Sequence, residues 1–129
     1  MGNTRARLVG ALFALGGLIS CGGSSSPTQP SLDPAVETNT ITITSSGVSP
    51  NNIIINAGTR VTFINNDTRS HNMNSDPHPA HTDCPALNVG ILATGQTGDS
   101  QPLTTVRSCG FHDHDNPNAG SLRGQVTIR

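Results

Sequence analysis

The sequence predicts an all-β fold, a Greek-key β-sandwich. Short runs rich in Ile, Val and Thr recur from residue 40 to the end, and clusters of Asn, Gly, Pro and Ser separate them. This pattern is typical of strands joined by turns. No segment shows the 3.6-residue apolar repeat of an amphipathic helix. Because the first part of the chain does not resemble a folded domain, the globular part has only about 90 residues, enough for one domain.

The expected strands follow one another closely along the domain. Ile41 and Ile43 alternate with Thr, and further apolar runs lie at residues 53–55 and 61–64. We expect three more strands, over residues 87–92, 103–109 and 124–129, the last of which closes a sheet. The stretches 71–85 and 112–121 are predicted as long polar loops, and they contain all five histidines of the chain. Loops of that length in so small a domain are usually functional or disordered.

The first 39 residues predict export and anchoring. Arg5 and Arg7 precede an apolar run over residues 8–19, which is too short to span a bilayer and typical of a secretory signal. The run ends in Leu18-Ile19-Ser20-Cys21, which resembles the lipobox of bacterial lipoproteins.

That resemblance implies three segments. Residues 1–20 are a signal peptide, residues 21–39 are a lipidated Cys21 and a flexible Gly/Ser/Pro tether, and residues 40–129 are the folded domain. We expect the domain to face the periplasm from a lipid anchor in the cell envelope, at the outer membrane rather than the inner if the cell is Gram-negative.

Composition excludes several function classes. The formal net charge is −1, all seven basic residues are Arg, and no run of like charge occurs, so a nucleic-acid partner is not expected. Trp and Tyr are absent, which excludes aromatic stacking platforms and tyrosine-based chemistry. We find no catalytic triad order, no His-Glu-x-x-His motif and no paired carboxylates, so neither an enzyme nor a small-molecule substrate is expected.

Two motifs resemble the cupredoxins, the small blue-copper proteins such as plastocyanin. The segment from Ala57 through Phe63 to Asp67 resembles the strand pair that leads to the first copper histidine of that family, and His71-Asn72 follows it. Near the other end, Cys109-Gly110-Phe111-His112 resembles the Cys-x-x-His ligand loop. The resemblance covers the domain from about residue 40 onward.

This resemblance implies a copper site and a function. The ligands of one copper ion would be His71, Cys109 and His112, with Asn72 as support and Leu122 where a weak axial Met usually lies. Two imidazoles and one thiolate form a trigonal copper site that transfers single electrons. A cupredoxin-like lipoprotein that exchanges electrons with a redox protein partner in the cell envelope is therefore the leading hypothesis.

Cys84 leaves alternatives open. Once Cys21 is lipidated, Cys84 and Cys109 are the remaining thiols, and in an oxidising compartment they would form a disulfide. The site would then consist of histidines, drawn from His71, His112 and one of the three others (His78, His81, His114). In the thiolate site, Met73 is the substitute for Leu122 at the axial position. The matching functions are copper capture or buffering in the envelope, or a metal-free structural module.

Overall fold

The structure is a computed structural model that describes residues 31–129. The predicted signal peptide, Cys21 and residues 22–30 of the predicted tether lie outside the described residues. The described chain forms ten strands and two short 3₁₀ helices. In chain order these are β1 (Val36–Glu37), β2 (Thr40–Thr44), β3 (Gly47–Ser49), β4 (Asn52–Ile55), β5 (Thr62–Asn65), β6 (His71–Ser75), η1 (Pro85–Leu87), β7 (Gly90–Leu92), β8 (Thr97–Asp99), β9 (Arg107–Asp113), η2 (Gly120–Leu122) and β10 (Arg123–Ile128).

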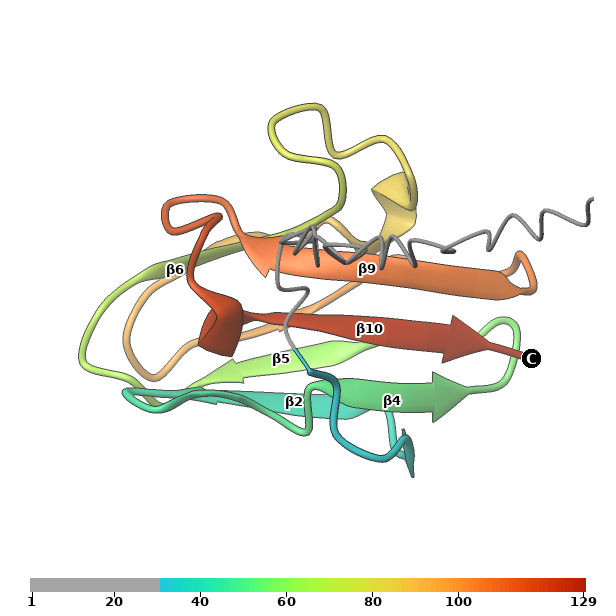
Figure 1. Ribbon diagram of the computed structural model, residues 1–129, viewed down its shortest axis with the longest axis horizontal. Coiled ribbons are helices and arrows are strands. Elements are labelled where there is room, and N and C mark those ends of the chain that lie inside the picture. Colours follow the sequence, from blue (N-terminus) through green and yellow to red (C-terminus); the bar gives the residue numbers. More distant parts are fainter. Residues whose placement is uncertain (1–30) are drawn as a thin grey trace, which may run out of the picture.

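Two mixed sheets pack into a sandwich (Figure 1). The six-stranded sheet has the order β1-β4-β10-β9-β6-β7, and the four-stranded sheet has the order β3-β2-β5-β8. In the larger sheet β9 pairs antiparallel with both β10 and β6, so it occupies a central position. The all-β sandwich predicted from the sequence is therefore confirmed.

Alternating side chains build the core between the sheets. In β2, Ile41 and Ile43 are fully buried while the three threonines that alternate with them are partly exposed, as expected when successive residues face opposite sides of a strand. Phe63 of the smaller sheet meets Phe111 of the larger one edge to face, with ring centroids 5.4 Å apart. This pair joins the two sheets at the centre of the core.

Several element boundaries differ from the sequence prediction. His71–Ser75 is a strand rather than a loop, because its polar residues pair with β7 and β9. The expected strand over residues 87–92 begins only at Gly90. The expected strand over 103–109 is displaced, since Leu103 makes a single bridge to Thr59 and β9 runs on to Asp113. The sheet also begins at β1, before residue 40, through parallel pairing with β4.

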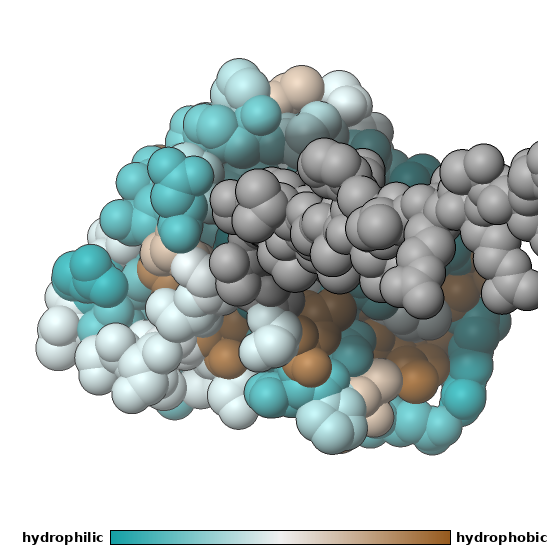
Figure 2. All heavy atoms as spheres, in the orientation of Figure 1, coloured by the Kyte–Doolittle hydropathy of each residue, from teal (hydrophilic) through white to brown (hydrophobic). Residues whose placement is uncertain are grey.

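The surface differs between the strands and the loops. In Figure 2 the hydrophobic colour gathers over β4 and β10, whereas the loop between β6 and η1, at the top of the view, is mainly hydrophilic. Among residues 31–129, no helix has the length and apolar character needed to cross a membrane.

The aromatic pair yields a stability prediction. Phe63→Ala leaves a cavity between the sheets and should lower the free energy of unfolding by about 3–5 kcal/mol. Urea denaturation of the purified protein measures this loss. Thr97→Ala on the exposed side of β8 is the control, and a loss for Phe63→Ala as small as that of the control would contradict the role of the pair.

Candidate metal centre

Strand β9 presents two different faces. Cys109, Phe111 and Asp113 alternate along it and are buried, and Cys109 and Phe111 belong to the hydrophobic core. His112 lies between Phe111 and Asp113 and therefore points to the opposite face of the strand. His114, two residues further along, points to the same face as His112. The His-x-His sequence at the end of this strand, with His114 just beyond β9, thus places two imidazoles together on the side away from the core.

The loop over residues 76–84 covers this outer face. Its first residue is fixed to β9, because the Asp76 N–H donates to the carbonyl of Gly110 at 3.0 Å. Gly110 has no side chain there, and a Cβ atom at this position would overlap the Asp76 carboxylate. The loop then carries His78 and His81 over His112, with ring centroids 5.4 and 5.2 Å from the His112 ring.

The result is a cluster of four imidazoles. One ring nitrogen from each of His78, His81, His112 and His114 lies within 4.8 Å of the others. Nδ1 of His114 and Nε2 of His81 are only 3.1 Å apart. Ligands on opposite sides of one ion lie about 4 Å apart at metal–nitrogen distances of about 2.0–2.1 Å. A contraction of less than about 1 Å would therefore bring all four nitrogens onto one ion.

His112 is already oriented for such an ion. Its Nδ1 lies 2.7 Å from Oδ1 of Asp76, which fixes the proton on Nδ1 and leaves the lone pair on Nε2. Nε2 is buried and has no hydrogen-bond partner within the described chain. Buried polar atoms are rarely left without a partner. In a typical metal-binding histidine, one ring nitrogen donates its hydrogen to a carboxylate and the other nitrogen is left free to bind the metal. His112 has this arrangement.

His81 is held in an unusual conformation. Its φ is +54°, in the left-handed region, which costs a residue other than Gly about 1–2 kcal/mol. Three hydrogen bonds maintain it: its N–H donates to Pro77 O at 2.8 Å, and its carbonyl accepts from Ser75 Oγ at 3.0 Å and Asn88 Nδ2 at 3.2 Å. Backbone strain that the surroundings impose in this way is frequent at functional sites.

The cluster favours neutral imidazoles. Desolvation lowers the pKa of His78 below 6.5, and repulsion from His114 and His112 lowers it further. Desolvation also lowers the pKa of His81, again with repulsion from neighbouring rings, while the Asp76 carboxylate acts weakly in the opposite direction. Neutral rings keep the lone pairs that a metal ion requires.

His71 does not belong to this cluster. It lies fully buried on the core side of β6, with Nε2 2.9 Å from Asp67 Oδ2 and Nδ1 3.0 Å from Asp113 Oδ2. Both ring nitrogens therefore contact carboxylates, and neither faces a metal position. The prediction that His71 is a copper ligand disagrees with this structure, which gives the residue a structural role between β5, β6 and β9.

Cys109 also differs from its predicted role. Its sulfur is bonded to that of Cys84, with the two Cα atoms 6.0 Å apart, and a disulfide sulfur is not a thiolate ligand. In addition, Cys109 and His112 lie three residues apart on one continuous strand, so they point to opposite faces. Of the predicted ligands His71, Cys109 and His112, only His112 lies in the cluster.

The two other candidate ligands are core residues. Met73 is fully buried on the core side of β6, and Leu122, in η2, is 5% exposed. Both belong to the hydrophobic core, so neither lies at the histidine cluster.

Solved structures resemble this sandwich. A purple cupredoxin from Nitrosopumilus maritimus matches with a TM-score of 0.58 and 22% identity over 71% of this chain and 100% of that one. Oxidised plastocyanin from Dryopteris crassirhizoma matches with a TM-score of 0.56 and 17% identity, over 70% of this chain and 99% of that one. A Cu(I) form of an amicyanin mutant matches with a TM-score of 0.52 and 20% identity, over 75% of this chain and 84% of that one.

The domain has the cupredoxin fold. No protein-family model and no curated protein sequence matches the chain. Within the cupredoxin fold, the Cys-x-x-His segment lies here on one straight strand, and its cysteine is in a disulfide.

The buried Asp67–His71–Asp113 group predicts a pH-dependent stability. The hydrogen bond from His71 lowers the pKa of Asp67 below 3.8, against the opposing effect of burial. Burial raises the pKa of Asp113, but hydrogen bonds from Asn72, Asn116 and His71 outweigh it, so the net pKa is also lowered. A depressed carboxyl pKa stabilises the fold above 3.8, and this stability is lost as the pH falls through the lower folded-state value.

Asp67→Asn should therefore lower the urea midpoint at pH 7, and the difference from wild type should shrink as the pH falls below 3.8. Urea midpoints between neutral and acidic pH measure both effects. Asp83→Asn, an exposed carboxylate, is the control. A difference that stays constant with pH would contradict the role of the Asp67 carboxylate.

Asp76 is a positioning residue that the sequence did not reveal. Asp76→Asn removes the carboxylate from His112 Nδ1 and should weaken Cu²⁺ binding by about 10- to 100-fold. Isothermal titration calorimetry against a competing chelator measures the affinity. Thr82→Ala, exposed and adjacent to His81, is the control, and unchanged affinity in Asp76→Asn would show that His112 needs no such support.

Proposed function

We propose that this protein is a copper-capture or copper-buffering protein that holds one Cu²⁺ ion on His78, His81, His112 and His114. The observation that carries the proposal is the unpartnered, buried Nε2 of His112 among three further imidazoles. A metal ion bound there would give Nε2 of His112 the partner that it lacks, and each of the four imidazoles would supply one ligand nitrogen. Imidazole suits copper and zinc, and divalent affinity at a given site is highest for Cu²⁺.

Copper rather than zinc also agrees with the fold. An amicyanin of the same fold was solved with Cu(I), and this is the support for carrying the metal over to the present chain. A cavity of about 550 Å³, lined in part by His78, His112 and Arg123, opens beside the cluster. This cavity brings solvent to two of the four histidines, His78 and His112, as a capture protein requires.

The place of the protein in the cell is part of the same proposal. The secretory signal and lipobox-like Cys21 favour a domain held at the membrane by lipid, on the periplasmic side of the envelope. A flexible tether would let the histidine centre exchange copper with other envelope proteins. The disulfide agrees with an oxidising compartment.

Electron transfer is the second candidate. Its support is the likeness to plastocyanin. A mutant fern plastocyanin was solved in oxidised and reduced forms, and its structure matches the present one with a TM-score of 0.57. Among residues 31–129, however, both cysteines are joined in the disulfide, so the thiolate that makes electron transfer fast in the predicted site is missing. Cyclic voltammetry of the copper-loaded protein distinguishes the two: a reversible, rapid couple supports electron transfer, and its absence supports capture.

Titration tests the copper site directly. The oxidised protein should bind one equivalent of Cu²⁺ without intense thiolate-to-copper absorption, and either His81→Gln or His112→Gln should weaken binding by at least about tenfold. The readouts are calorimetry and visible absorption. Thr82→Ala should bind like wild type. Equal affinity in wild type and both histidine variants would refute the site.

A further inference from the structure

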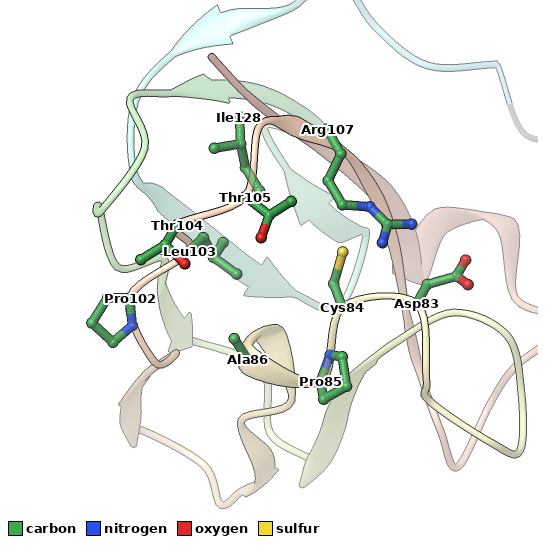
Figure 3. Close-up of a pocket in the computed structure, with 10 residues that line it drawn as sticks. All are labelled: Asp83, Cys84, Pro85, Ala86, Pro102, Leu103, Thr104, Thr105, Arg107 and Ile128. Atoms are coloured by element: carbon green, nitrogen blue, oxygen red, sulfur yellow. The ribbon is translucent and has the colours of Figure 1, made fainter.

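The disulfide is accessible from one side only. Cys84 is 6% exposed and Cys109 is 1% exposed. Cys84 lines a surface pocket of about 140 Å³, together with Leu103, Thr105 and Arg107. Figure 3 shows the Cys84 sulfur pointing toward the space between Thr105 and Arg107. A molecule in this pocket would reach the sulfur of Cys84, whereas Cys109 faces the core.

The chemistry of the pocket suits a small thiol. Thiol–disulfide exchange begins when a thiolate approaches one sulfur of the bond, so access decides which sulfur is attacked. The exposed Arg107 carries the positive charge that attracts a thiolate. Asp83 adds one negative charge at the rim. The volume of about 140 Å³ admits a thiol side chain rather than a folded protein surface.

The disulfide also fixes the loop that completes the histidine cluster. Cys84 lies three residues after His81, and Cys109 lies three residues before His112. Three residues span at most about 11 Å of chain. The cross-link therefore joins the loop that carries His78 and His81 to the strand that carries the other ligands. Without the disulfide, no covalent cross-link holds this loop, and its remaining restraints include the hydrogen bonds of Asp76, Ser75 and Asn88.

We propose that Cys84 is a thiol–disulfide exchange site for small thiols, and that opening the bond there weakens metal binding at the histidine cluster. The second part rests on the proposed copper function; the first does not. The thiolate of a small thiol attacks Cys84 Sγ, the Cys84–Cys109 bond breaks, and Cys109 leaves as a thiolate that takes up a proton. A second thiol then releases Cys84 as a thiol, so two small thiols are oxidised to one disulfide while the protein disulfide is reduced.

Peptide mapping tests the exchange site. The purified, metal-free protein is incubated with glutathione, and free thiols are then blocked with iodoacetamide. Trypsin cuts after Arg69, Arg107 and Arg123, so the two cysteines fall on different peptides. We expect glutathione on Cys84 and carbamidomethyl on Cys109. Glutathione mainly on Cys109, or no adduct in the folded protein, would overturn the proposal.

A matched pair of variants tests the pocket. Thr105→Phe fills the space beside Cys84 and should slow the glutathione reaction by about tenfold. Thr94→Phe adds the same bulk at an exposed turn that does not line the pocket and should leave the rate unchanged. Equal rates for both variants would show that this pocket is not the route of attack.

Copper affinity tests the coupling. The oxidised protein is compared with the reduced, iodoacetamide-blocked protein and with the Cys84→Ser/Cys109→Ser variant, in which no added group disturbs the core. Circular dichroism confirms that each form is folded. We expect Cu²⁺ binding at least about fivefold weaker in both open forms. Equal affinity in all three forms would overturn the coupling but leave the copper function intact, whereas no Cu²⁺ binding by the oxidised protein would refute the copper function and leave the exchange site standing.

Discussion

The alternation of side chains along β9 determines where the chemistry of this domain lies. Cys109, Phe111 and Asp113 face the core, and His112 faces outward. Phe111 packs against Phe63 of the opposite sheet, so the strand cannot rotate without breaking the core. Because the strand is fixed, the sulfur of Cys109 and the imidazole of His112 are held on opposite sides of one sheet and do not converge on one ion.

The core-facing cysteine has a structural use instead. By bonding to Cys84 it anchors the end of the loop over residues 76–84, and the backbone contact between Asp76 and Gly110 anchors the beginning. Between these two points the hydrogen bonds of Ser75 and Asn88 hold His81 in its left-handed conformation. The cupredoxin fold thus positions a cluster of four imidazoles on its outer face.

The sequence predicted the sandwich well because β-branched alternation reports directly on which residues meet the core. It did not predict β6, since His71, Asn72 and Asn74 have none of the apolar character of a strand. The pairing of this segment with β9, and the contact of His71 with Asp113, join residues that are distant in the chain. The predicted ligand set differs from the histidine cluster for a similar reason. Spacing alone does not show whether Cys109-Gly110-Phe111-His112 turns or runs straight. The His-x-His sequence at residues 112 and 114, where β9 ends, was the signal for the outer face. Asp76 is recognisable only once the loop is seen against Gly110.

Two sets of copper ligands are in question: the four histidines of the cluster, and the predicted set of His71, Cys109 and His112. They differ in whether a sulfur atom binds the ion. X-ray absorption at the copper edge, measured on the oxidised protein loaded with one equivalent of Cu²⁺, identifies the atoms around the ion. A centre built from the four histidines predicts a shell of imidazole nitrogens at about 2.0 Å and no sulfur. A sulfur scatterer at bonding distance would contradict it, because none of the four proposed ligands carries sulfur.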